Sequence, residues 1–136
     1  MEINPAGSAI TPTTIAAWDD SAATVVAITP DTLYVGFNNN TNPASGSQLI
    51  ALEKSNPGTQ KWSFPVDGLF NQQIAVDKDS NAYFSTKSGH LYSVDPTGHE
   101  RWHISVDIGS NTSVISPVLT ENGIVWGYLN KIILVK

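Results

Sequence analysis

Three oxygen-bearing side chains stand at alternate positions in one short segment of the chain. Asp77, Asp79 and Asn81 have the Asp-x-Asp-x-Asn spacing of a calcium-binding loop, in which carboxylate and amide oxygens surround one hard cation. The segment lacks the glycine at the sixth position and the glutamate at the twelfth that complete such a loop. Asp and Asn are also favoured in tight turns, because their side chains hydrogen-bond nearby backbone groups. We therefore interpret the segment as a turn between two strands, with calcium as the weaker alternative and no other cofactor expected.

The three histidines are the remaining candidate metal ligands. His99 and His103 are four residues apart, a spacing that places two zinc ligands on one face of a helix. On a strand, side chains at this spacing stand well separated along one face, and His90 lies on another predicted strand. We therefore expect surface histidines and no metal site. The chain has no cysteine, which excludes disulfides and thiolate chemistry.

Residue types suited to nucleophilic catalysis also occur close together in the sequence. Ser88 and His90 are two residues apart in a predicted turn, which is not the arrangement of a nucleophile with its general base. Asp67 and Asp107 each follow a tryptophan by five residues. Recurrence in two copies of a repeat is typical of a structural position, whereas a catalytic residue usually occurs in one copy. An enzyme is therefore the less favoured expectation.

The composition of the chain excludes some classes of partner. Charged residues make up 14% of the 136 residues, against ~25% in ordinary soluble domains. The net charge is −5 and the seven Lys and Arg residues are scattered, so we expect no nucleic-acid partner. No apolar run approaches the ~18 residues of a membrane-spanning helix. A surface built from Asn, Gln, Ser and Thr resembles that of exported proteins, which favours an extracytoplasmic or cell-surface location in a bacterium.

A repeat of about 40 residues organises the chain. Trp62 and Trp102 are 40 residues apart, and each stands four residues after a glycine, Gly58 or Gly98. Apolar runs of four to six residues precede each tryptophan and end in Gly, Pro, Asn or Asp, whereas helical repeats need longer amphipathic segments. The pattern predicts an all-β fold of β-propeller blades, each of four antiparallel strands, with about three blades per chain.

The repeat also predicts the boundaries of the domain. Residues 1–14 are expected to be an N-terminal extension and residues 15–136 a three-blade propeller unit, with its parts at 15–18, 24–68, 72–109 and 115–136. The segment 15–18 is predicted to be a strand that carries a third docking tryptophan, Trp18. No glycine stands four residues before Trp18.

The residues around the second tryptophan resemble the PQQ-like repeat of the quinoprotein alcohol dehydrogenase-like propeller family. That repeat has the form Ala-x-Asp-x-x-Thr-Gly-x-x-x-Trp, and this chain has Ser93-Val94-Asp95-Pro96-Thr97-Gly98-His99-Glu100-Arg101-Trp102, one residue shorter in the turn. The segment 51–62 is one residue longer than the pattern. The resemblance covers residues 24–136 and implies that Trp62 and Trp102 are tryptophan-docking residues, packed between neighbouring blades.

The family includes quinone-dependent dehydrogenases, the propeller lipoprotein of the outer-membrane barrel-assembly machinery and uncharacterised surface proteins, so the resemblance implies a fold more than a function. We expect a non-enzymatic propeller scaffold or binding module for protein or glycan contacts, with the long loop 38–47 as a candidate recognition segment. The alternative is a fragment of a quinone-dependent dehydrogenase or another propeller enzyme.

Three blades fill only part of the circle of a propeller, which has four to eight blades. The open arc would expose apolar blade faces and a strand edge. We therefore expect copies of the chain to close a ring as a homo-oligomer, most simply a dimer of six blades.

Overall fold

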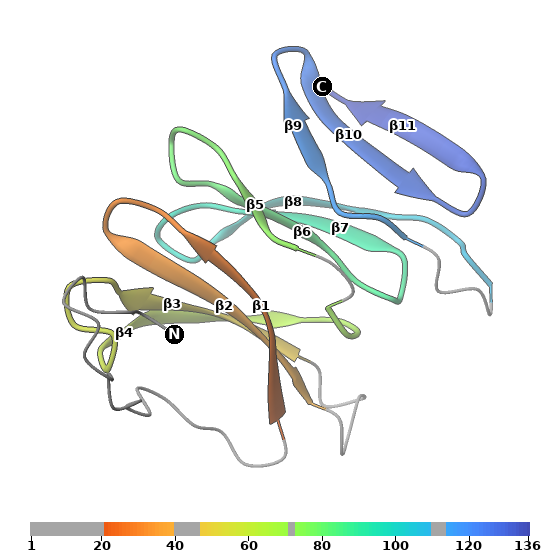
Figure 1. Ribbon diagram of the computed structural model, residues 1–136. Helices are drawn as coiled ribbons and strands as arrows, with labels where there is room; N and C mark the ends of the chain where they lie inside the picture. The colour runs from red at the N-terminus through yellow and green to blue at the C-terminus, as the bar shows by residue number, and fades with distance from the viewer. Residues whose placement is uncertain (1–20, 40–46, 71–72, 110–113) are drawn as a thin grey trace, which may run out of the picture.

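In a computed structural model, which describes residues 21–39, 47–70, 73–109 and 114–136, the chain forms three antiparallel β-sheets (Figure 1). The first sheet has the order β1-β2-β3-β4, the second β5-β6-β7-β8 and the third β11-β10-β9. The strands of the first sheet are β1 (Ser21–Ile28), β2 (Thr32–Asn39), β3 (Ser47–Glu53) and β4 (Gln60–Val66). Those of the second are β5 (Ala75–Val76), β6 (Ala82–Ser85), β7 (His90–Val94) and β8 (Glu100–Ser105). Those of the third are β9 (Val118–Thr120), β10 (Gly123–Tyr128) and β11 (Lys131–Val135).

Each sheet is a meander, since strands that are consecutive in the chain lie side by side and pair with one another. The turn from β1 to β2 shows how the sequence makes such a connection. The hydroxyl oxygen of Thr29 accepts a hydrogen bond from the backbone N–H of Thr32 at 3.0 Å, and the Thr29 hydroxyl also lies 3.1 Å from the Asp31 carboxylate. These side chains hold the backbone in the tight reversal that an antiparallel pair needs. The predicted all-β fold with four-stranded antiparallel sheets is confirmed.

The three sheets lie one after another in sequence order, as blades of a propeller do (Figure 1). The first strands of the three sheets follow one another across the stack, because β1 contacts β5 and β5 contacts β9. One core cluster lies between the first two blades and includes Tyr34, Phe70 and Phe84. A second cluster lies between the second and third blades and includes Leu91, Ile124 and Trp126.

The middle blade is buried on both faces, as expected for a blade with two neighbours. Leu91 and Ser93 are fully buried on the face toward the third blade. Tyr92 and Val94 belong to the cluster on the other face, where the Tyr92 ring stacks on Phe84 with ring centroids 5.3 Å apart. Alternate residues of one strand therefore serve two different cores.

The third sheet differs from the first two because it has three strands and ends at β11. The strand predicted at 15–18, with Trp18, lies outside the described residues, as does the whole segment 1–20. Trp126 on β10 is fully buried against the second blade. Among the described residues, no helix is long and apolar enough to span a membrane.

Candidate functional site

The Asp77–Asn81 segment is the turn between β5 and β6. Asp77 Oδ1 accepts hydrogen bonds from the backbone N–H groups of Asp79 and Asn81, both at 2.9 Å. Asp77 Oδ2 accepts from Asn81 Nδ2 at 2.8 Å and from the Tyr83 hydroxyl at 2.9 Å. Burial alone would raise the pKa of Asp77, but the hydrogen bonds from Asn81, Tyr83 and Asp79 outweigh it and hold the pKa below its usual value. Both carboxylate oxygens of Asp77 accept hydrogen bonds from groups of the same turn and from Tyr83. This arrangement supports the interpretation as a turn over that as a calcium site.

The structure brings two of the three histidines together. The rings of His90 on β7 and His103 on β8 have centroids 6.2 Å apart, and Glu100 shares a hydrogen bond of 2.7 Å with His103. His99 lies in the β7–β8 turn instead, where its Nδ1 is 2.9 Å from the Thr97 hydroxyl. Within the described residues, no three His, Asp or Glu side chains are grouped so as to hold a metal ion.

A polar group that sequence reasoning missed joins the first two blades at His90. His90 Nδ1 is 2.8 Å from Ser105 Oγ, and His90 Nε2 is 3.5 Å from Asp67 Oδ2. In the sequence, the serine nearest to His90 is Ser88. In the structure, the β7–β8 register places Ser105 directly opposite His90. In a hydrolytic triad the carboxylate hydrogen-bonds the imidazole, which needs a shorter contact than 3.5 Å, and the Asp67 side chain is 78% exposed. We interpret this group as a polar link between blades.

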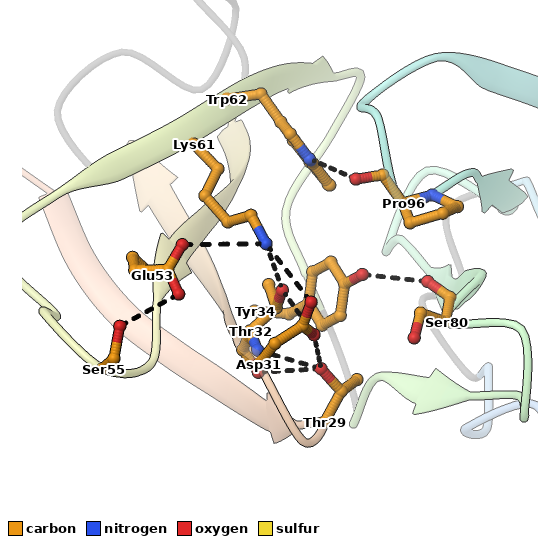
Figure 2. A network of polar contacts seen from close by, with 10 residues as sticks. All are labelled: Thr29, Asp31, Thr32, Tyr34, Glu53, Ser55, Lys61, Trp62, Ser80 and Pro96. Atoms are coloured by element: carbon orange, nitrogen blue, oxygen red, sulfur yellow. Dashed lines mark hydrogen bonds and ion pairs between the residues drawn. The ribbon is translucent and has the colours of Figure 1, made fainter.

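The boundary between the first two blades is crossed by Trp62 (Figure 2). Its indole Nε1 donates a hydrogen bond of 2.9 Å to the Pro96 carbonyl in the β7–β8 turn. Its ring also lies against Gly98, where a Cβ atom would be 2.8 Å from the ring carbons Cγ and Cδ2. Gly98 has a φ of +90°, so both its backbone and its contact with Trp62 require glycine.

The Asp95 side chain shapes the turn that receives Trp62. Asp95 Oδ1 accepts hydrogen bonds from the Thr97 hydroxyl at 2.7 Å, from the Thr97 backbone N–H at 2.8 Å and from the His99 backbone N–H at 3.0 Å. The pKa of the Asp95 carboxyl lies below its usual value, mainly because of the hydrogen bond from the Thr97 hydroxyl. The segment Asp95-Pro96-Thr97-Gly98 thus presents the Pro96 carbonyl and Gly98 to the neighbouring blade.

The Tyr34 ring packs against Trp62, with ring centroids 5.7 Å apart, and Lys61 precedes Trp62 on β4 (Figure 2). Tyr34 is fully buried and donates a hydrogen bond of 2.9 Å from its hydroxyl to the Ser80 carbonyl of the second blade. Burial raises the pKa of Tyr34 to about 12, assisted by the charge of Asp31. Lys61 Nζ lies 3.7 Å from the Asp31 carboxylate and 4.0 Å from that of Glu53. This cation is therefore neutralised within its own blade.

Trp102, the second copy of the repeat tryptophan, borders an open cleft. Its ring packs 6.1 Å from that of Tyr83, between the second and third blades. The cleft has a volume of about 350 Å³, and its lining includes Arg101, Trp102, Val135 and Lys136. Arg101 donates hydrogen bonds to the Tyr83 hydroxyl at 2.9 Å and to the Ser93 hydroxyl at 3.2 Å. The two tryptophans of the repeat therefore meet different surroundings.

The outer face of the third sheet is apolar and exposed. Ile132 pairs with Gly127 of β10, just as Leu49 pairs with Gly36 and Leu91 with Ser85 in the first two blades. Leu49 and Leu91 are fully buried by the next blade, whereas Ile132 is 75% exposed. The neighbouring Val118 and Leu134 are 53% and 46% exposed. The face that the next blade covers elsewhere is open here.

The other end of the stack is different. Val35, Ile50 and Leu52 on the outer face of the first blade form a buried cluster of their own. Among the described side chains of this blade, the large apolar ones that are clearly exposed are Val26 and Ile28, both on β1. In the described residues, the open apolar surface is therefore concentrated at the third sheet.

The long loop proposed for recognition is anchored at both ends. Asn38 Oδ1 accepts a hydrogen bond of 2.7 Å from the backbone N–H of Phe70, and Asn38 Nδ2 donates to the Phe70 carbonyl at 3.2 Å. Ser47 Oγ donates to Asn38 Oδ1 at 3.2 Å. These two residues have a structural role, and residues 40–46 lie outside the described residues.

Comparison with known proteins shows the fold of the chain. No protein-family model and no curated protein sequence matches it. Among solved structures, the chain is similar to BamB from Moraxella catarrhalis, with 17% identity over 74% of this chain and 29% of BamB and a TM-score of 0.57. It is also similar to a protein of unknown function from Bacteroides caccae, with 14% identity over 89% of this chain and 47% of that protein and a TM-score of 0.52. The similarity to BamB, a β-propeller, agrees with the propeller arrangement of the sheets, and the chain spans less than half the length of either protein.

Proposed function

We propose that this chain is a non-enzymatic propeller scaffold that makes protein contacts through the outer face of its third sheet. The observation that supports the proposal is the exposure of Val118, Ile132 and Leu134 at positions whose counterparts in the other blades are covered. Contiguous exposed aliphatic side chains are typical of protein-interaction surfaces. The sequence analysis expects protein or glycan contacts, and these exposed aliphatic side chains favour protein contacts.

A photo-crosslinking amino acid at position 132 tests the protein-contact function. In an extract of the source organism we expect a small number of defined protein adducts, which decrease strongly when Leu134→Asp is added. The same amino acid at position 28, on the exposed strand β1, is the matched control. Adducts at position 132 that are absent, or that are indistinguishable from those at position 28, would refute the proposed function.

We also infer the docking role of the family for Trp62 and Trp102, and this role is supported best for Trp62 by its contacts with Pro96 and Gly98. The alternative, part of a quinone-dependent dehydrogenase, predicts a bound quinone or a retained metal ion. For a scaffold we expect a colourless protein without calcium after dialysis. Quinone absorbance, or calcium found by mass spectrometry, would favour the enzyme.

Ring closure by copies of this chain remains a prediction. A ring would place the third sheet of one copy against the first blade of another. In the first blade, however, Ile50 and Leu52 are only 1% and 3% exposed, so these two side chains offer no open apolar surface to the third sheet of another copy. Sedimentation equilibrium at micromolar protein tests the ring, and a species with the mass of one chain would refute it. A location outside the cytoplasm is likewise a proposal, supported by the low content of charged residues.

A further inference from the structure

A cluster of two imidazoles and two carboxylates lies at the boundary between the first two blades. The imidazoles are His90 on β7 and His103 on β8, whose rings lie 5.9 Å and 5.5 Å from that of Tyr92. The carboxylates are Asp67, which follows β4, and Glu100 on β8. Burial raises the pKa of Tyr92, and the charges of Asp67 and Glu100 add to this effect, although a hydrogen bond with the Asp67 backbone opposes it. Both carboxylates therefore act on the same ring.

Backbone contacts hold the two sides of this cluster together. The segment that begins at Asp67 runs along the β6–β7 turn, and the Lys87 N–H donates a hydrogen bond of 2.8 Å to the Leu69 carbonyl. Gly68 packs so closely against the same turn that a Cβ atom there would collide with its side chains. This turn leads directly into His90 at the start of β7. The separation of Asp67 and His90 is therefore set by contacts other than their own.

The charge of His90 decides how much this link contributes. Its Nδ1 lies 2.8 Å from Ser105 Oγ, and its Nε2 lies 3.5 Å from Asp67 Oδ2. The second distance is long for a hydrogen bond between neutral groups but is within reach of an ion pair. An imidazolium has an N–H on both nitrogens, so it donates to Ser105 and pairs with Asp67 at the same time. An imidazole takes up this proton between about pH 8 and pH 5.

The charged groups around His90 come from three elements. The connection after β4 contributes Asp67, and β8 contributes Glu100 together with His103, the other group that titrates in this range. Glu100 Oε1 lies 2.7 Å from His103 Nδ1, so a proton on His103 is balanced within β8. On the β6–β7 turn, Lys87 forms no ion pair in the described part of the chain. Protonation of both imidazoles therefore converts two unmatched carboxylates into two ion pairs.

We propose that the contact between the first two blades is pH-sensitive, and that proton uptake by His90 opposite Asp67 strengthens it at mildly acidic pH. The protonated form of His90 is the one with both partners, so the added stability is present at about pH 5.5 and is lost as the pH rises towards about 8. Below about pH 4 the carboxylates take up protons and the effect ends. The inference is independent of the protein contacts proposed for the third sheet, because this cluster joins the other two blades.

Urea denaturation tests this contact as a double-mutant cycle of Asp67→Asn and His90→Gln at two pH values. The Asp67 side chain is 78% exposed, so solvent screens the pair and the expected coupling is small. We expect a coupling of about threefold in the unfolding equilibrium constant at about pH 5.5, and none at about pH 8. All buffers contain EDTA, so that a metal ion bridging the histidines does not contribute.

Asp107→Asn is the matched control, because Asp107 occupies the same position of the repeat as Asp67. Its carboxylate accepts a hydrogen bond of 2.9 Å from the Gly109 N–H and forms no ion pair among the described residues. It is expected to show no coupling with His90→Gln at either pH. If His90→Gln does not fold by circular dichroism, the comparison of the parent with Asp67→Asn decides, and their difference in stability should grow on acidification. Coupling of equal size at both pH values, or a difference that does not grow, would overturn the proposal.

Discussion

Replacing Gly98 with alanine tests the contact between the first two blades. At Gly98 the backbone φ is +90°, and a Cβ atom would stand 2.8 Å from two carbons of the Trp62 ring and 3.1 Å from a third. Contacts of this length force the indole to move. Movement of the ring breaks the hydrogen bond of 2.9 Å between Trp62 Nε1 and the Pro96 carbonyl.

The expected cost has two parts. Placing an alanine at positive φ costs about 1–2 kcal/mol. Displacing Trp62 loses a hydrogen bond worth at most about 1 kcal/mol and exposes part of the indole, which adds about 1 kcal/mol. Gly98→Ala is therefore expected to lower the free energy of unfolding by about 3 kcal/mol. This is a large part of the stability of a small domain.

Urea denaturation followed by circular dichroism measures this cost. Gly109→Ala is the matched control, because Gly109 has a φ of +57° and a Cβ atom added there would meet no atom within 4 Å. This replacement therefore has only the cost of an alanine at positive φ. In a Trp62→Ala background, Gly98→Ala should cost no more than Gly109→Ala does in the parent. Equal effects of the two glycine replacements in the parent chain, or additive effects of Gly98→Ala and Trp62→Ala, would refute the assigned contact.

Three other predictions follow from the described contacts. Asp77→Asn is expected to destabilise the fold at neutral pH, because Asp77 has a lowered pKa and its stabilisation is complete above the unfolded pKa. The difference from the parent should shrink as the pH falls from about 5 to about 2, which acid-dependent urea melts would show. Trp62→Ala should cost more than Trp102→Ala in the same melts, by about 1 kcal/mol, since only Trp62 has a hydrogen-bonded carbonyl and an opposing glycine among the described residues. Gly58→Ala should be neutral or should stabilise by up to about 1 kcal/mol, because its nearest contact is 3.9 Å away and its φ is not positive; a loss of stability in thermal melts would contradict this.

The sequence was sufficient to predict the blades. The recurrence of Gly and Trp at a separation of 40, with apolar runs between turn residues, predicted four-stranded sheets that the structure contains. Leu91 and Tyr92, which are neighbours on β7, are buried in different cores. Periodicity is informative here because a strand enclosed by two neighbours is apolar on both faces.

Contacts between blades could not be predicted in the same way. Gly58 and Gly98 occupy the same place in the repeat, yet only Gly98 has a tryptophan ring beneath it and a positive φ. Ser105 and His90 are fifteen positions apart, and only the β7–β8 register brings them together. Such differences depend on which blade stands next to a residue, and a repeat pattern contains no information about that neighbour.

The stacking order has a consequence for how the chain unfolds. Each sheet is closed by local hairpins, and the two clusters between sheets join only consecutive blades. Stability in such an arrangement is a sum of blade and nearest-neighbour contributions, as in solenoid proteins. Among the described residues the third sheet has three strands and packs against one other blade, so we expect it to detach at a lower free energy than the middle blade. Limited proteolysis would then begin beyond β8, and the first two blades would survive as the resistant fragment.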